Sequence, residues 1–227
     1  MHDYGLPVLN KEQAFSIKQL VARKEETLTQ ANETSAPSGE GLAGKLPPYT
    51  KKLLIWSFSI AIIPPLVLVA ALSMKSMYLL DYVHVISGGS WTGFDLYSGL
   101  ILTRIMRSLE LPARVEIAKR LTPTTFFILP SLAATAITAG IYLAQSIGIF
   151  NLSDPWIIAA GIVVLILTAQ GFGVFMPNGV RIFIELAKTK PDTSKIAKLN
   201  MRNIKLAGSQ AIFQVIIILI MAHFAMP

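Results

Sequence analysis

The chain has 227 residues, of which 53% are hydrophobic and 15% are charged, and its charges fall in blocks between long apolar runs. This pattern is typical of a polytopic membrane protein. The absence of cysteine excludes disulfides, thiolate metal sites and thiol nucleophiles. The formal net charge of +7 does not indicate nucleic-acid binding, because basic residues in a membrane protein gather in its cytoplasmic loops.

Residues 1–50 are predicted to be a polar N-terminal arm and linker, with no apolar core of a signal peptide. Ala14, Ile17 and Val21 fall near one side of a weak amphipathic helix that we expect over residues 11–28. Residues 29–48 are rich in serine, glycine, proline and glutamate, which favours a disordered linker.

Residues 51–227 are predicted to form an all-α bundle of five transmembrane helices. The five spans are expected at residues 53–74, 78–103, 125–149, 155–176 and 207–226. Each has about 20 residues or more, which is enough to cross a hydrocarbon core of about 30 Å. Pro64 and Pro65 should kink the first helix, and a neighbouring helix or side chain must compensate for the backbone donors that they remove.

The distribution of basic residues predicts the orientation of the bundle. Nineteen of the 20 lysines and arginines lie before the first span, between the second and third, or between the fourth and fifth; Lys75 alone lies on the other side. By the positive-inside rule, the N-terminus is expected in the cytoplasm and the C-terminus outside, in a multi-pass protein of the cell membrane.

The last cytoplasmic loop carries a basic face on an expected helix. It consists of Lys195, Lys198, Arg202 and Lys205, which recur at spacings of three, four and three. This face could bind anionic lipid headgroups, or it could be an ordinary solvated surface beside the membrane.

A polar stripe runs along the second span and makes it the candidate functional helix. At 100° per residue the stripe contains Asp81, His84, Ser87, Gly88, Trp91, Asp95, Ser98 and Gly99. Ionisable groups within a span need a partner, a proton or a water path, so Asp95 in particular indicates function. Gly89 and Gly93 form a G-x-x-x-G pair on the opposite side, a pattern that lets helices pack closely, and the second helix is expected to be central. Seams of small and hydroxyl residues on the third and fourth spans are expected to pack against this stripe.

Two histidines are predicted to reach a similar depth near the outer side. His84 lies about six residues inside the second span, and His223 lies about four residues from the end of the fifth. Two imidazoles on different helices could ligate haem b or copper, and the thioethers of Met221 and Met226 near His223 would favour copper(I). The alternative is that His223 is only an interfacial side chain.

The segment from His84 to Gly93, HVISGGSWTG, resembles the H-x-x-x-G-x-x-W-x-G opening of small membrane proteins related to the copper-resistance protein D group. The residues that carry the resemblance are His84, Gly88, Trp91 and Gly93. It implies a compact helical bundle over residues 78–226 with His84 on the outer side, in a group associated with copper handling and with haem or metal binding.

Three functions of different classes follow from these patterns. The first is a membrane protein that binds haem b or copper near its outer face through His84 and His223, for electron transfer or copper handling. The alternatives are an accessory subunit of a larger respiratory or copper-dependent membrane complex, and a small proton-coupled carrier that uses Asp95. No hydrolase, nucleotide-binding or metalloprotease motif is present, so an enzyme is not indicated.

Overall fold

The computed structural model describes residues 19–20, 23–24 and 45–225. The expected amphipathic helix at residues 11–28 and the linker at residues 29–48 therefore lie mostly outside the described residues, and so does Met226. The chain divides into two units, at residues 1–41 and 42–227.

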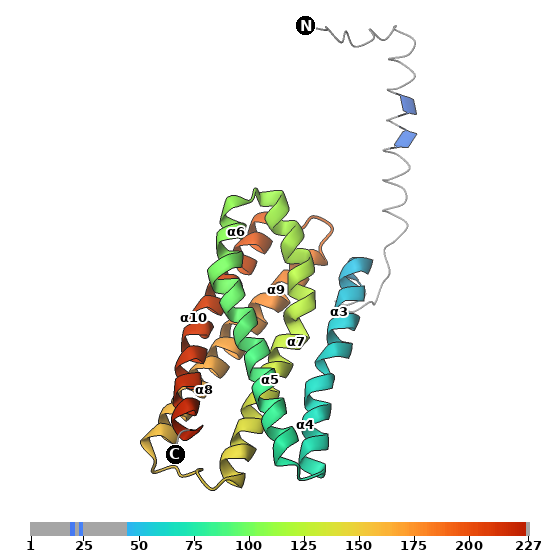
Figure 1. Ribbon diagram of the computed structural model, residues 1–227. Helices are drawn as coiled ribbons and strands as arrows, with labels where there is room; N and C mark the ends of the chain where they lie inside the picture. The colour runs from blue at the N-terminus through green and yellow to red at the C-terminus, as the bar shows by residue number, and fades with distance from the viewer. Residues whose placement is uncertain (1–18, 21–22, 25–44, 226–227) are drawn as a thin grey trace, which may run out of the picture. The chain divides into compact units, whose positions relative to one another are not determined.

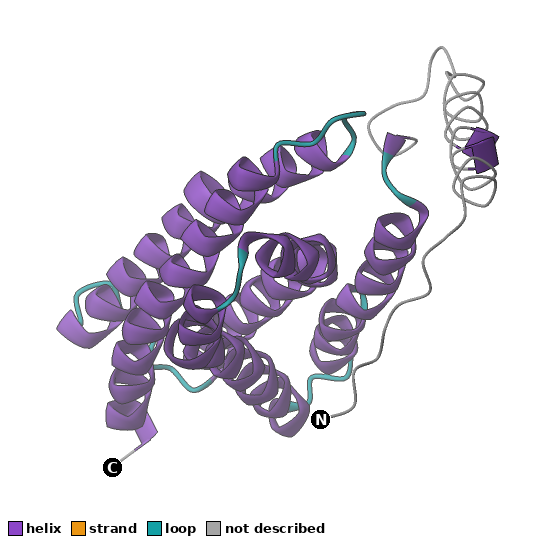
Figure 2. Cartoon of the chain, turned by 90° about the horizontal axis from the view of Figure 1, so that it is seen from above, coloured by secondary structure: helices purple, strands orange, loops and turns teal. Residues whose placement is uncertain are grey.

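Five helices joined by short loops make up the described part of the second unit (Figures 1 and 2), which confirms the predicted all-α bundle. Three of them contain an internal break or a change of helix type. The first helix consists of α3 (Pro48–Ala61) and α4 (Ile63–Ser73), and the second consists of α5 (Met77–Leu96), the π-helical segment η1 (Tyr97–Leu102) and α6 (Thr103–Ser108). The third helix is α7 (Leu111–Ser146), and the fifth is α10 (Thr193–Ala225). The fourth helix consists of α8 (Pro155–Gln170), the π-helical segment η2 (Gly171–Phe175) and α9 (Met176–Leu186).

Four of the five helices are long and apolar enough to cross a membrane, namely Pro48–Ser73, Leu111–Ser146, Pro155–Leu186 and Thr193–Phe224. The second helix, which carries the polar stripe, is not among these four. The outer surface of the bundle exposes large apolar side chains, such as Ile55, Leu165 and Leu219, each more than 60% accessible. Such a surface fits a lipid bilayer, where helices satisfy their own backbone polar groups.

The first helix breaks where its two prolines predict a kink, with Ile62 between α3 and α4. Pro65 has no N–H to donate to the carbonyl oxygen of Ala61, four residues earlier. The hydroxyl of Ser131, on α7, donates to that oxygen instead. A neighbouring helix therefore compensates for the lost backbone bond, as the sequence requires.

The third and fifth helices are longer than the predicted spans, because each continues without a break into the adjoining loop. The 36 residues of α7 extend about 54 Å, well beyond a hydrocarbon core of about 30 Å. Pro123 lies inside α7 and does not end it, although proline usually breaks or kinks a helix. The hydroxyls of Thr124 and Thr125 bond to carbonyl oxygens one turn earlier, at 2.7 and 2.9 Å, and this stretch stays helical.

The connections of the bundle separate the basic residues from the rest. In Figure 1 the α6–α7 and α9–α10 connections lie at the same end as the start of α3, and the α4–α5 and α7–α8 connections lie at the other end. The basic loops of the second unit therefore share one end of the bundle, and Lys75, in the α4–α5 turn, lies at the opposite end. This charge asymmetry is the pattern on which the predicted orientation depends.

Candidate functional site

Asp95 of α5 lies in the interior of the bundle, where its side chain has no accessible surface. Its Oδ2 accepts a hydrogen bond of 2.9 Å from Nε2 of Gln214 on α10. Neither the other carboxyl oxygen of Asp95 nor Oε1 of Gln214 has a hydrogen-bond partner among the described residues. A buried acidic group whose partners are all neutral is an expensive arrangement in a membrane, so this pair marks a candidate functional site.

The pair forms because α5–η1 and α10 come into backbone contact one turn away. A Cβ atom added to Gly99 would lie 2.3 Å from Cα of Gly208, which leaves no room for any side chain. The two helices run in opposite directions, so the residues that precede Gly99 face those that follow Gly208. This close approach brings Asp95 and Gln214 within hydrogen-bond distance.

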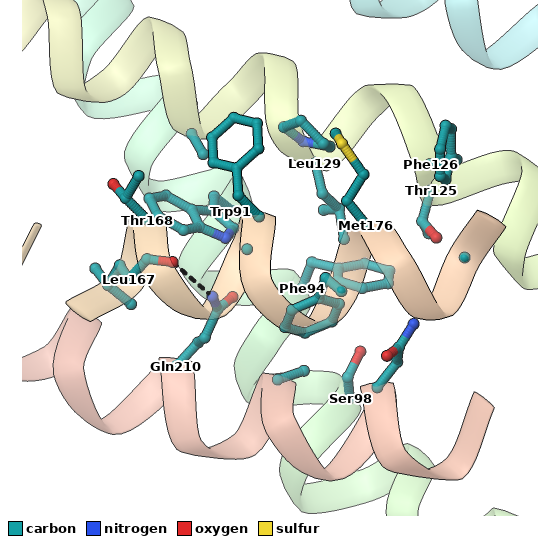
Figure 3. Close-up of a pocket in the computed structure, with 18 of the residues that line it drawn as sticks. Trp91, Phe94, Ser98, Thr125, Phe126, Leu129, Leu167, Thr168, Met176 and Gln210 are labelled. Atoms are coloured by element: carbon teal, nitrogen blue, oxygen red, sulfur yellow. Dashed lines mark hydrogen bonds between the residues drawn. The ribbon is translucent and has the colours of Figure 1, made fainter. Parts of the chain in front are cut away.

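Residues one turn from this pair border a cavity of about 290 Å³, and Figure 3 shows side chains that line it. Trp91 and Ser98, one turn before and one turn after Asp95, both contribute to its wall. Phe94 of α5 also lines it. The other walls come from α7, α8, η2, α9 and α10, and they include Phe126, Leu129, Leu167, Thr168, Gly171, Phe172, Phe175, Met176, Asn200, Asn203 and Gln210. The volume is near the lower end of the range for small-molecule sites.

Several buried polar groups line the cavity. Ser98 and Asn200 are almost fully buried, and the Ser98 hydroxyl and the Asn200 Nδ2 have no partner among the described residues. Gln210 donates through Nε2 to the carbonyl oxygen of Leu167, at 3.2 Å, as Figure 3 shows. Buried polar groups are normally hydrogen-bonded, so two unpartnered groups on residues of one cavity wall set this region apart from the rest of the bundle.

Both π-helical segments contribute to the same cavity: η1 supplies Ser98, and η2 supplies Gly171, Phe172 and Phe175. Such segments interrupt α-helices mostly as short stretches and are frequent at functional sites. Their placement therefore agrees with the buried carboxylate and the free polar groups in marking this region.

His84 packs between α5 and α7. Its Nδ1 lies 2.8 Å from the carbonyl oxygen of Ala136, and its ring covers Gly140, where an added Cβ would lie 2.7 Å from Cε1. A carbonyl oxygen can only accept, so Nδ1 carries the hydrogen and, in the neutral imidazole, Nε2 is the unprotonated nitrogen. This is the tautomer that a metal-ligating histidine with such a second contact usually has.

His223 has different neighbours. Its ring stacks on Trp156 of α8, with centroids 4.2 Å apart, and contacts Phe224 edge to face. Met221 packs instead into the apolar cluster of Trp91 and Ile220. The interactions of the described residues do not join His84 to His223, and no group of three or more potential metal-ligating His, Asp or Glu side chains occurs among them.

Burial of the other members of the polar stripe increases along α5. Asp81, near the start of α5, is exposed, whereas Ser87, Trp91 and Asp95 are buried. Gly89 and Gly93 are exposed on the opposite side, where an added Cβ would meet no described atom within 4 Å.

The expected basic face on α10 is present, and one of its members has a second role. Lys195, Lys198, Arg202 and Lys205 are all exposed. Nζ of Lys195 also donates to Oε1 of the buried Glu185, which accepts a second bond of 2.8 Å from Lys188. Lys195 therefore ties the end of α9 to the start of α10.

Several site residues lie on α10 and were not assigned a role from the sequence. Asn200, Asn203, Gln210 and Gln214 recur at spacings of three, seven and four, which places them near one side of a helix. This spacing could have indicated a polar side of α10 from the sequence alone. It does not tell which other helix packs against that side.

The fold and the site define an α-helical, multi-pass membrane protein with a buried Asp–Gln pair beside an internal cavity. In comparisons with models of protein families, with curated proteins and with solved structures, nothing matches the chain. The resemblance at residues 84–93 to the copper-resistance protein D group therefore stays an expectation.

Proposed function

We propose that this protein is a small membrane carrier in which a molecule bound in the cavity is coupled to a proton on Asp95. The observation that supports it is the burial of Asp95 beside a cavity whose wall includes Trp91 and Ser98, one turn away on either side. A carrier of this kind needs a substrate site and an acidic group that can change charge. Here residues of the cavity wall and the acidic group lie on the same helix, the second one.

The coupling follows from the contacts of the Asp95–Gln214 pair. As a carboxylate, Asp95 has only neutral donors, Gln214 and Trp91, and no ion-pair partner among the described residues. A proton on Oδ1 removes the buried charge and turns this unpartnered oxygen into a donor. Oε1 of Gln214 is an acceptor without a partner. A ligand that alters the packing of Trp91 or Ser98 changes the relative free energies of these two states, so binding and protonation are linked.

Infrared difference spectroscopy across a pH step tests the protonation of Asp95. The parent protein should show a change in the C=O band of a protonated carboxylic acid, and Asp95→Asn should lose it. Asp81→Asn is the matched control, because Asp81 lies on the same helix and is exposed. An unchanged band in Asp95→Asn would contradict the proposal.

Transport is tested in proteoliposomes loaded with a pH-sensitive dye, to which candidate small molecules are added outside. Proton entry that follows addition of a substrate should be absent in Asp95→Asn and retained in Asp81→Asn. Equal uptake of a transported molecule by the parent and by Asp95→Asn would show that transport does not use this carboxyl group.

A second candidate function is binding of haem b or copper through His84, for electron transfer or copper handling. It is supported by the hydrogen bond at Nδ1, which leaves Nε2 as the free ligating nitrogen. Purified protein should then show a Soret band or stoichiometric copper that His84→Ala abolishes. Colourless, metal-free protein from cells supplied with haem and copper would exclude it.

For the orientation, we infer that the end of the bundle with the α6–α7 and α9–α10 loops is cytoplasmic. The inference is supported by the gathering of basic residues at that end. The exposed side chains of Lys195, Lys198, Arg202 and Lys205 would then face the anionic inner leaflet and its headgroups.

A further inference from the structure

We propose that the cavity takes an uncharged, elongated amphiphile that enters sideways from the bilayer, between α7 and the α8–η2 segment. This inference rests on the proposed function, because it names the class of molecule that the carrier site takes. Three features of the cavity support it: the absence of charge in its wall, the uneven placement of its free polar groups, and the position of its exposed rim.

No lysine, arginine, histidine, aspartate or glutamate is among the residues that line the cavity. An ionic headgroup bound there would lose its water without gaining an opposite charge, which costs more than the apolar contacts return. The wall is instead largely aromatic and aliphatic, with Trp91, Phe94, Phe126 and Phe175 as its large members. These properties select a neutral molecule with an apolar body.

The cavity is long, and the two buried unpartnered groups of its wall, Ser98 Oγ and Asn200 Nδ2, lie on the basic side of Trp91. On α10 it extends from Asn200 to Gln210, which is about 15 Å at 1.5 Å per residue. The free donor Nδ2 of Asn200 lies toward the basic end of the bundle, whereas Trp91 packs with Leu167 and Ile220 toward the other end. A ligand is expected to place a hydroxyl or carbonyl oxygen near Asn200 and its tail near Trp91.

The rim of the cavity lies on the outer surface of the apolar spans. Four lining residues are also exposed: Pro130 and Ala134 on α7, Thr168 on α8 and Phe172 on η2. All four lie within helices that are apolar enough to cross the membrane. The opening between these helices therefore faces hydrocarbon, and a molecule dissolved in the bilayer reaches the site without passing through water.

Quenching of Trp91 fluorescence by a brominated probe tests the proposal. Of the three tryptophans, Trp56 and Trp156 are replaced by phenylalanine, so that Trp91 alone reports in nanodiscs. The probe is bromoundecanol with bromine on the carbon farthest from the hydroxyl. We expect saturable quenching, because the hydroxyl binds near Asn200 and the bromine then lies near Trp91.

The blocking variant is Gly171→Leu, and Gly173→Leu is its matched control. Both glycines belong to η2 and both have open space where a Cβ would be added, but only Gly171 lines the cavity. Quenching should need about tenfold more bromoundecanol in Gly171→Leu and be unchanged in Gly173→Leu. If Gly171→Leu does not fold, Asn200→Leu replaces it, because it removes the unpartnered donor, and the same loss is expected.

Bromoundecyltrimethylammonium has the same chain length with a permanent charge, and it should quench Trp91 without saturation. The proposal is overturned if both probes quench alike, if bromoundecanol quenching rises linearly with its concentration in the membrane, or if both glycine variants retain parent quenching. Asp95→Asn should still bind bromoundecanol. Saturable binding of bromoundecanol to the parent protein without any coupled proton entry would therefore refute the carrier and leave this site intact. Coupled proton entry in the parent protein without saturable quenching would refute this site and leave the carrier intact.

Discussion

At the scale of single residues, Gly140 has no space for a side chain because the His84 ring lies against it. Gly140→Ala would place Cβ 2.7 Å from Cε1 of His84, so the imidazole must move away from Ala136. We expect a loss of about 1–3 kcal/mol in the free energy of unfolding, the usual cost of overpacking. Thermal unfolding in detergent measures it, and the imidazole NMR signals of His84 should shift.

Gly88→Ala is the control for this variant. It lies on α5, one turn from His84, and its added Cβ would be 3.8 Å from Cβ of Ala136, an ordinary contact. If Gly88→Ala and Gly140→Ala unfold at the same temperature, the packing of His84 against α7 is not what restricts Gly140.

The Asp95–Gln214 pair predicts a characteristic double-mutant result. Gln214→Leu leaves a buried carboxyl group without its partner and should cost about 1–3 kcal/mol of unfolding free energy. Asp95→Leu combined with Gln214→Leu should cost less than Gln214→Leu alone, because the buried carboxyl group that needs Gln214 is no longer present. Denaturation of the single and double variants measures this coupling, and additive losses would show that the two side chains are independent.

The candidate site could be predicted from the sequence on one side only. Asp95 could be singled out because it is an acidic residue inside an apolar span. The helical rotation of 100° per residue placed Trp91 and Ser98 on the same side of the helix. Its partner on α10 could not be named, because the pairing depends on a helix crossing between residues more than 100 positions apart in the chain. Tertiary packing also decides that Asp81 is exposed and that His84 contacts α7.

At the scale of helices, the contact of Gly99 with Gly208 sets the distance between the second and fifth helices. Gly99→Ala would place Cβ 2.3 Å from backbone, which cannot move as a side chain does, so the helices must separate. We expect a loss in unfolding free energy at the upper end of about 1–3 kcal/mol or beyond it. The same variant should weaken the Asp95–Gln214 bond and therefore alter the protonated-carboxyl infrared band.

Gly93→Ala provides the comparison on the same helix, because an added Cβ there meets no described atom within 4 Å. Its stability should equal that of the parent or exceed it slightly, since alanine favours helix over glycine. A Gly99→Ala protein as stable as Gly93→Ala would show that the close crossing is not needed.

The number and order of the helices could be predicted, since each follows from an apolar run of sufficient length. The break near Pro64 and Pro65 was also predictable, because proline removes a backbone donor. Two features depended on more than local sequence. Pro123 lies within α7 with the Thr124 and Thr125 hydroxyls bonded one turn back, and the change to π-helix in η1 occurs where Gly99 meets Gly208.

At the scale of the whole molecule, the charge asymmetry and the cavity predict a direction. The free polar groups of the cavity lie toward the end that carries the basic loops, and the opposite end carries the short α4–α5 and α7–α8 connections. If the basic end is cytoplasmic, the polar end of the cavity lies in the inner half of the bilayer. The orientation of the bundle therefore decides which leaflet supplies the polar head of a bound molecule.

The absence of cysteine from the chain makes this orientation directly measurable. Leu152→Cys lies in the exposed α7–α8 connection and Thr189→Cys in the exposed α9–α10 connection, at opposite ends of the bundle. A membrane-impermeant maleimide added to intact cells should label Leu152→Cys and leave Thr189→Cys unlabelled, because basic loops stay inside. Inverted vesicles should give the reverse pattern, and labelling of Thr189→Cys in intact cells would place the polar end of the cavity in the outer leaflet instead.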